Sequence, residues 1–295
     1  MIKDFNNLME KAKEKGVFKV SVVCADDKEV LKAIKIAVDE GLISPILVGD
    51  REKIEKISKE IGLEKYEVID EKENPAKVGV MLVREKKADI LMKGMINTSD
   101  YLRAVLNKEY GLRTERRLSL LAVYELPQYH KLLYTTDSGV NVEPDLELKK
   151  QILTNTLLAM EEMGFDKPKV AVLSSNEKVS EKIQSTVDAQ GLVEMADKGD
   201  IPPCVIEGPI AFDVAFDKEA AVHKNIDSKI AGDVDVLLYP NIESGNILGK
   251  SWLRFNNAKW AGIILGAAAP VILGSRSDTS EIKVNSIALA CLSSV

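Results

Sequence analysis

The residues best suited to bind an anion follow an apolar run near the end of the chain. Gly274, Ser275 and Arg276 come directly after Pro270-Val-Ile-Leu273, which is expected to be a strand. A guanidinium group matches two phosphate oxygens at once, and serine hydroxyls and the amides of a following helix add donors. The alternative is a group of helix-capping residues with Arg276 in solvent. We favour anion binding, because an arginine at the end of a buried strand otherwise lacks a partner.

A lysine and a glycine hold the same kind of position earlier in the chain. Lys93 and Gly94 follow the expected strand Asp89–Met92, and Thr98 could cap the next helix. The lysine, the backbone amides and the helix N-terminus together suit an anion such as phosphate. A single lysine is a weak signal, however. Taken alone, the segment favours an ordinary strand–turn–helix connection with a solvated lysine.

Three side chains with oxygen atoms follow the apolar run that begins at Leu133. Asp137, Asn141 and Asp145 carry the donors that hard cations prefer. Their spacing is not the alternate-residue spacing of a calcium loop, and no glutamate completes such a loop. We therefore favour a turn that satisfies the backbone, caps the next helix and forms one wall of a substrate site, over a metal site.

A fourth polar segment follows the expected strand Val234–Tyr239. Gly245 and Asn246 are expected to open a helix that carries Lys250. Glycine permits close approach of a ligand, and asparagine and lysine supply a neutral and a charged donor. A helix N-terminus capped by an asparagine explains the same residues equally well.

Composition narrows the class of protein. The chain has 295 residues, 45% hydrophobic and 29% charged, with a net charge of −6 and 5% aromatics. This describes a soluble globular protein without a generic nucleic-acid surface. Three scattered cysteines and two histidines exclude a disulfide framework and a His-rich metal site. No secretory signal or membrane-spanning stretch is expected, so a reducing, cytoplasmic location is the default.

Familiar nucleotide and hydrolase motifs are missing. The chain has no GxxxxGK[ST], no GxGxxG after its first strand, no GxSxG and no HExxH. A P-loop enzyme, a standard dinucleotide fold and a zincin are therefore disfavoured.

Short apolar runs alternate with helical patterns along the chain. Repeats of this length predict a parallel sheet covered by helices on both faces. Without a flexible linker, two α/β domains with a tight interface fit the length. The expected strands are Phe18–Cys24, Pro45–Val48, Tyr66–Ile69, Asp89–Met92, Lys169–Leu173, Val234–Tyr239 and Trp260–Leu265. Expected helices include Asp145–Met163, Lys178–Gln190 and Glu281–Leu292.

The ordered set of segments resembles the phosphate acetyl/butyryl transferases, and within that family the butyryl branch. The similarity extends over nearly the whole chain. The segments that carry it are Met92-Lys-Gly94 with Thr98, Tyr101–Leu112, Thr136–Asp145, Pro168–Leu173, Glu207–Asp213, Ala231–Asp235, Pro240–Asn246 with Lys250, Ala261-Gly262, and Ser275–Asp278 with Lys283.

The resemblance implies a fold and a reaction. The fold would be two α/β domains with a cleft between them, like isocitrate and isopropylmalate dehydrogenases. The first domain would comprise residues 1–142 and 262–295 and the second residues 143–261. The reaction would be acyl-CoA + phosphate ⇌ acyl phosphate + CoA, with butyryl or a similar short chain. Coenzyme A is then a substrate, no tightly bound cofactor or metal is needed, and a homo-oligomer is expected.

The family's residue roles transfer to matching positions. The resemblance makes Ser275 and Arg276 the pair that binds the phosphoryl group and stabilises the tetrahedral transition state. Glu281 is the candidate base for the CoA thiol, although its alignment needs a one-residue gap. The expected substrate-binding residues are Lys93, Gly94, Thr98, Asp137, Asn246, Lys250 and Lys283. The chain departs from many relatives at Gly274, where they have threonine, and at Leu120, where butyryl-type relatives often have histidine.

Other functions remain alternatives at this point. One is a phosphate acetyltransferase of the same family, and another is a module that binds CoA or phosphate without catalysis. A divergent dehydrogenase would need a carboxylate cluster for a metal and a nicotinamide site, and the sequence offers neither.

Overall fold

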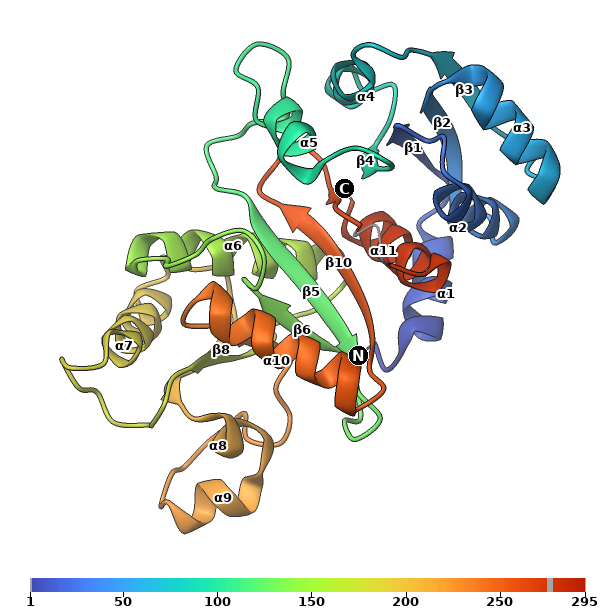
Figure 1. Ribbon diagram of the computed structural model, residues 1–295. Helices are drawn as coiled ribbons and strands as arrows, with labels where there is room; N and C mark the ends of the chain where they lie inside the picture. The colour runs from blue at the N-terminus through green and yellow to red at the C-terminus, as the bar shows by residue number, and fades with distance from the viewer. Residues whose placement is uncertain (1, 275–277, 295) are drawn as a thin grey trace. The chain divides into compact units, whose positions relative to one another are not determined.

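A computed structural model describes residues 2–274 and 278–294 of the chain (Figure 1). Contacts divide it into two compact units. The central unit is residues 117–259, and the split unit joins Ile2–Arg116 to the chain from Trp260 onward. The unit boundaries therefore lie at 116/117 and 259/260, whereas the sequence prediction placed domain boundaries at 142/143 and 261/262.

The split unit is built on a mainly parallel sheet. Its strands lie in the order β3-β2-β1-β4-β11-β10, and only the β10–β11 pair is antiparallel. Its elements are α1 (Phe5–Glu14), β1 (Phe18–Val23), α2 (Lys28–Asp39), β2 (Ile43–Gly49), α3 (Arg51–Ile61), β3 (Glu67–Asp70), α4 (Pro75–Arg84), β4 (Ile90–Lys93), α5 (Thr98–Val105), β10 (Lys259–Leu265), β11 (Val271–Ile272) and α11 (Ser280–Ser293).

The order in which the chain adds strands to this sheet reverses at β1. From β1 the chain moves outward to β2 and β3, and then returns past β1 to β4. Because such crossovers are right-handed, α2 and α3 cover one face and α4 covers the other. Helix α4 approaches closely at Gly79, whose carbonyl accepts a hydrogen bond from Ser21 of β1 at 3.1 Å. The C-terminal ends of β1 and β4 thus lie side by side at a topological switch point, where α/β sheets bind ligands.

Helix α11 lies in the interior of the split unit. It packs against both α1 and α2, and its residues from Lys283 to Ser293 are buried (Figure 1). A helix that is apolar around most of its circumference must be covered on all sides. The C-terminal segment therefore belongs to the core that the N-terminal residues form.

The central unit is built on five further strands. Its strands lie in the order β5-β6-β9-β7-β8, and all pairs except β5–β6 are parallel. Its elements are β5 (Ser119–Glu125), β6 (Leu133–Thr136), α6 (Leu146–Glu162), β7 (Lys169–Leu173), α7 (Gln184–Asp197), β8 (Val205–Ile210), α8 (Phe212–Phe216), α9 (Lys218–His223), β9 (Val236–Leu238) and α10 (Ile242–Phe255).

Helices cover both faces of these five strands. Asn155 of α6 donates to the hydroxyl of Ser119 in β5 at 3.0 Å, so α6 lies on the face to which Ser119 points. Tyr124 points to the opposite face, because side chains alternate along a strand. There, a Cβ on Gly249 of α10 would lie only 2.2 Å from the Tyr124 hydroxyl, so α10 covers this face closely. The α/β class predicted from the sequence is confirmed in both units.

Most predicted elements match the structure, with one clear error. The predicted helix Lys178–Gln190 begins only at Gln184 and continues to Asp197. The Thr186 hydroxyl accepts a hydrogen bond from the Ser180 amide and donates to the Ser180 carbonyl, so the preceding segment forms a turn. Strands β5 and β8 were not predicted.

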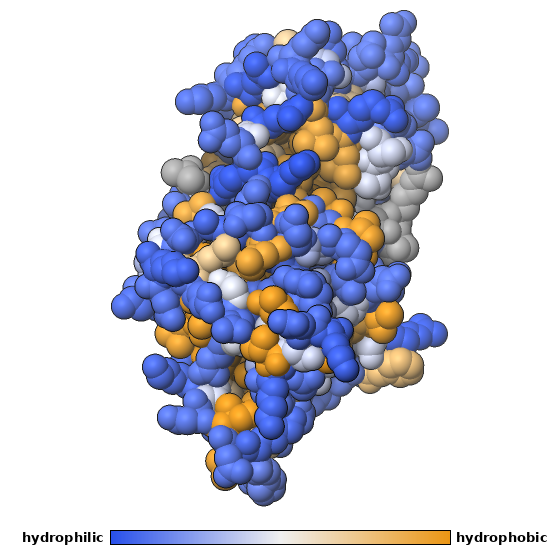
Figure 2. Space-filling view, turned by 90° about the vertical axis from the view of Figure 1, so that its left-hand side faces the viewer, coloured by the Kyte–Doolittle hydropathy of each residue, from blue (hydrophilic) through white to orange (hydrophobic). Residues whose placement is uncertain are grey.

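One face of the molecule is mostly polar. Hydrophilic side chains cover most of the face in Figure 2, with scattered apolar patches between them. Across the described residues, the helices are all too short or too polar to cross a bilayer.

Candidate functional site

The first set of site residues lies where β4 ends in the split unit. Lys93 is only 3% exposed, so its interpretation as a solvated lysine is wrong. Its Nζ donates to the carbonyl oxygens of Gly94 at 3.4 Å and of Gly274 at 3.3 Å. Strands β4 and β11 are parallel neighbours, with Met92 opposite Ile272. The strand register therefore brings Lys93 to the residues that follow β11.

Gly94 lets two strands meet closely. A Cβ at this position would lie 2.2 Å from the carbonyl oxygen of Cys24. The amides of Gly94 and Met95 donate to the carbonyls of Val23 and Cys24, at 2.8 and 2.9 Å. The glycine is thus required by the backbone contact between the ends of β1 and β4. Burial raises the pKa of the Cys24 thiol to about 11, which leaves it a poor nucleophile.

Asp278 contacts a second buried lysine. Lys283 of α11 is 4% exposed, and its Nζ donates to the Asp278 carbonyl. A Cβ at Gly274 would lie 3.8 Å from the Asp278 carboxylate and 4.0 Å from Cε of Lys283. Gly274, Asp278, Lys93 and Lys283 are therefore neighbours.

The remaining predicted residues of this unit differ in how far the structure describes them. Ser275 and Arg276 lie outside the described residues. Glu281 is exposed on the first turn of α11. The prediction that Thr98 caps a helix is wrong, because α5 begins at Thr98 and Asn97 takes the capping position.

The second set of site residues lies where β6 and β9 end in the central unit. Asp137 is buried, and its two carboxylate oxygens accept hydrogen bonds from the amides of Gly139, Val140 and Asn141 at 2.9–3.1 Å. The Asn141 side chain adds a fourth bond at 2.6 Å. Burial raises the pKa of Asp137, and these hydrogen bonds act against that rise. The carboxylate is occupied by its own turn, as the favoured interpretation held.

Helix α10 begins beside this turn. Asn241 is its N-cap and accepts a hydrogen bond from the Ser244 amide at 3.0 Å, so the helix opens earlier than Gly245 and Asn246, where it was predicted to begin. Asn246 donates to the Ser138 carbonyl at 3.4 Å. Lys250 follows one turn later and is exposed on the same side of the helix. The structure thus brings Asn246 to the Asp137 turn and places Lys250 nearby on α10.

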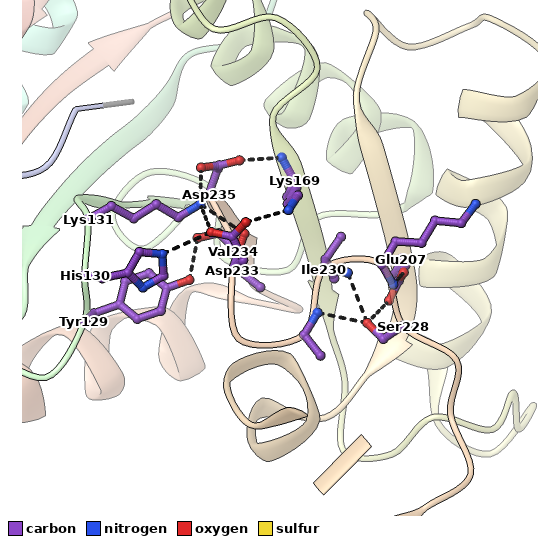
Figure 3. Close-up of polar contacts among 12 residues, drawn as sticks. Tyr129, His130, Lys131, Lys169, Glu207, Ser228, Ile230, Asp233, Val234 and Asp235 are labelled. Carbon is purple, nitrogen blue, oxygen red and sulfur yellow. Dashed lines mark hydrogen bonds and ion pairs between the residues drawn. The ribbon is translucent and has the colours of Figure 1, made fainter. Parts of the chain in front are cut away.

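A polar cluster that no sequence pattern indicated lies at the opposite ends of these strands (Figure 3). Lys131 contacts Asp235 at 2.6 Å and Asp233 at 2.8 Å, and Lys169 contacts Asp233 at 2.5 Å. Burial raises the pKa of Asp233, but hydrogen bonds from Lys131, Lys169 and His130 outweigh it and hold that pKa far below its usual range. No local sequence pattern indicates this cluster. It follows from the pairing of β6 with β9, which brings Asp233 and Asp235 to Lys131.

No metal centre is formed by the described part of the chain, where His, Cys, Asp and Glu never gather in threes with suitable geometry. The three cysteine thiols are free.

The chain belongs to the family described as "Phosphate acetyl/butaryl transferase", whose model matches residues 70–291. It is 42% identical to a phosphate butyryltransferase of Clostridium acetobutylicum, over 99% of this chain and 98% of that protein. It is 43% identical to a phosphate butyryltransferase of Clostridium beijerinckii, with the same coverage. Among solved structures, it resembles a branched-chain phosphotransacylase from Enterococcus faecalis at a TM-score of 0.84 and 31% identity, covering 94% of this chain and 98% of that one.

Proposed function

We propose that the chain transfers a short acyl group between coenzyme A and phosphate, with butyryl-CoA + phosphate ⇌ butyryl phosphate + CoA as its main reaction. Near-complete coverage of a butyryltransferase at 42% identity is the observation that carries this proposal. The neighbouring lysines at Gly274 agree with it, because a phosphoryl group needs cationic and amide donors.

The proposed mechanism is direct attack without an acyl-enzyme. The CoA sulfur, as thiolate, attacks the carbonyl carbon of the acyl phosphate, and the resulting tetrahedral oxyanion collapses by breaking the bond between carbon and phosphate oxygen. Phosphate leaves with the bonding electron pair, and a base takes the thiol proton. In this proposal Ser275 and Arg276 bind the phosphoryl oxygens and stabilise the oxyanion. Glu281 takes the proton, which its exposed place on the first turn of α11 permits.

The residues of the central unit are proposed to bind the acyl-CoA. Asn246 and Lys250 present a neutral donor and a cation from one side of α10. Asp137 contributes indirectly, by holding the turn from which the Ser138 carbonyl faces Asn246. Lysine binds phosphates as a point charge, which suits the phosphates of CoA.

Three further expectations complete the proposal. They are an architecture like that of isocitrate and isopropylmalate dehydrogenases, a homo-oligomer, and a reducing cytoplasmic environment. The split unit, which joins residues 2–116 to the chain from Trp260, supports the first of these. The free thiols agree with the last.

A thiol-release assay tests the function. Purified protein should release CoA thiol from butyryl-CoA only when phosphate is present, without NAD or magnesium. Parallel rates with acetyl-, propionyl- and isobutyryl-CoA determine the acyl preference, for which one methylene is worth about 1–3 kcal/mol. Fastest turnover with acetyl-CoA would make the protein an acetyltransferase, and binding of CoA without turnover would make it a non-catalytic module.

Replacing the proposed oxyanion donor should abolish most activity. We expect Arg276→Ala to lower kcat by about 10²–10³, the range seen when one such donor is lost. Circular dichroism and the unfolding midpoint should match those of the wild type. Near-normal turnover of a folded variant would remove Arg276 from the mechanism.

A further inference from the structure

We infer that Leu120 is a specificity-determining residue, whose side chain contacts the acyl chain of the bound acyl-CoA. The inference deepens the proposed function and rests on it for the identity of the substrate. All the residues that support it belong to the central unit, where they lie on β5, on the turn of residues 137–141 and on α10.

Leu120 lies at the end of the sheet where β6 finishes. Strand β5 is antiparallel to β6, so the start of β5 lies beside the residues that follow β6. Two hydrogen bonds join these segments. The Thr136 hydroxyl donates to the Leu120 carbonyl at 2.9 Å, and the Asn141 side chain donates to the Leu118 carbonyl at 2.9 Å. The backbone of Leu120 is therefore fixed to the turn of residues 137–141.

The Leu120 side chain packs against the same turn. A Cβ on Gly139 would lie only 2.7 Å from Cδ2 of Leu120, so the glycine leaves room for the leucine. Gly139 itself is exposed. The next four residues of β5, 121–124, are all buried, whereas Leu120 is partly exposed. Leu120 thus has apolar surface available to a ligand.

The turn also contacts the helix that carries the proposed CoA-binding groups. The Asn246 side chain donates to the Ser138 carbonyl at 3.4 Å, and a Cβ on Gly245 would lie 2.9 Å from Cβ of Ser138. Because Ser138 and Gly139 are consecutive, Asn246 and Leu120 adjoin neighbouring residues of one turn. An amide donor and an apolar side chain therefore meet at this turn. An acyl-CoA needs this combination, since its carbonyl and amides are polar and its acyl chain is apolar.

Hydrogen bonds within the turn hold this arrangement in place. The Asp137 carboxylate accepts bonds from three backbone amides and from the Asn141 side chain. A specificity contact needs such support, because its geometry must be held to within about 0.5 Å. The acyl chain would then meet Leu120 in a fixed position, where one methylene in contact is worth about tenfold or more in kcat/KM.

Acyl-chain kinetics test the inference. We would measure kcat/KM for butyryl-CoA and for acetyl-CoA in Leu120→Ala and in Leu120→Met, which conserves apolar volume. The ratio of butyryl to acetyl values should fall about tenfold in Leu120→Ala, because acetyl lacks the methylenes that the leucine contacts. Leu120→Met should keep the ratio within about threefold of the wild type. A folded Leu120→Ala protein in which the ratio falls by less than about threefold would overturn the inference.

A matched control separates this contact from general destabilisation. Leu158 is a leucine of the same unit that is 36% exposed on α6. Leu158→Ala should leave the ratio of butyryl to acetyl values unchanged. An equal fall of the ratio in this control would overturn the inference.

A binding measurement keeps the inference distinct from the proposed function. Calorimetric titration gives the Kd of butyryl-CoA and of acetyl-CoA without turnover. If the wild type releases no CoA thiol, the proposed function fails, but the inference stands if butyryl-CoA binds more tightly than acetyl-CoA and Leu120→Ala loses that difference. Equal Kd values for the two ligands in the wild type would overturn the inference whatever the activity.

Discussion

Buried lysines of the two units differ in what they contact. In the central unit Lys149 lies 2.5 Å from Asp188, and Lys131 lies within 2.8 Å of two aspartates. In the split unit Lys93 and Lys283 donate to backbone carbonyls beside Gly274. A carbonyl satisfies a donor but does not cancel a charge, whereas a carboxylate does both.

This difference predicts which substitutions change the free energy of unfolding and which change ligand binding. A buried lysine–carboxylate pair has no net charge, and removing one partner leaves an uncompensated charge in the core. The lysines beside Gly274 belong to the region that we propose binds phosphate. Changes to the central pairs should therefore alter unfolding, and changes near Gly274 should alter ligand binding.

The largest effect on stability is expected from Lys149→Met. Both partners of the pair are 5% exposed, so the variant buries an unpaired Asp188 and should lose about 3–5 kcal/mol of unfolding free energy. Urea denaturation measures this loss. The double variant Lys149→Met/Asp188→Leu should regain most of it. If the single variant unfolds like the wild type, the distinction between lysines that pair with carboxylates and lysines that donate to carbonyls is wrong.

Two glycine variants probe the packing beside the lysines. Gly94→Ala would bring Cβ to 2.2 Å from the Cys24 carbonyl, and relieving that overlap should cost about 1–3 kcal/mol. Among the described residues, the Cβ of Gly274→Ala would meet nothing closer than 3.8 Å, so this variant should change the unfolding free energy by less than about 0.5 kcal/mol. Thermal unfolding of the two proteins side by side measures both. Equal losses would show that the space beside Gly274 is already filled.

The smallest expected effect is a change in acid sensitivity. The pKa of Asp233 is held below its ordinary value of 3.8, so its carboxylate stabilises the fold above that pH and loses this contribution as pH falls through the folded-state pKa. Unfolding free energies at about pH 5 and pH 3 should differ less in Asp233→Asn than in the wild type. The same pH dependence in both proteins would show that other carboxylates cause the acid loss.

The fold could be predicted where the residue pattern of a segment matches its environment in the structure. The strand Lys169–Leu173 is a simple apolar run and was predicted with its observed bounds. Strand β8 was missed because Glu207, Gly208 and Pro209 interrupt its apolar pattern. It is an edge strand, where a proline is tolerated since one side needs no ladder partner.

The residue types of the candidate site could be predicted from the sequence, but the burial and the contacts of their side chains could not. Polar residues after apolar strands identified Lys93 and Asp137, because parallel strands end at one edge of a sheet. Burial of Lys93 and Lys283 was not predictable, since it depends on the pairing of β4 with β11 and on the enclosed position of α11. Pairs such as Lys131 with Asp235 join residues far apart in sequence, and no local pattern records them.

The enclosed position of α11 also bears on how the protein is made. During synthesis the central unit is complete once residue 259 has left the ribosome, so it can fold while translation continues. The N-terminal part of the split unit cannot complete its packing at this stage. Helices α1 and α2 pack against α11, and β4 pairs with β11, and both α11 and β11 are made later. Until the last helix emerges, the nascent chain exposes the apolar surfaces that α11 later covers. We expect the nascent chain to be most prone to aggregation in that interval.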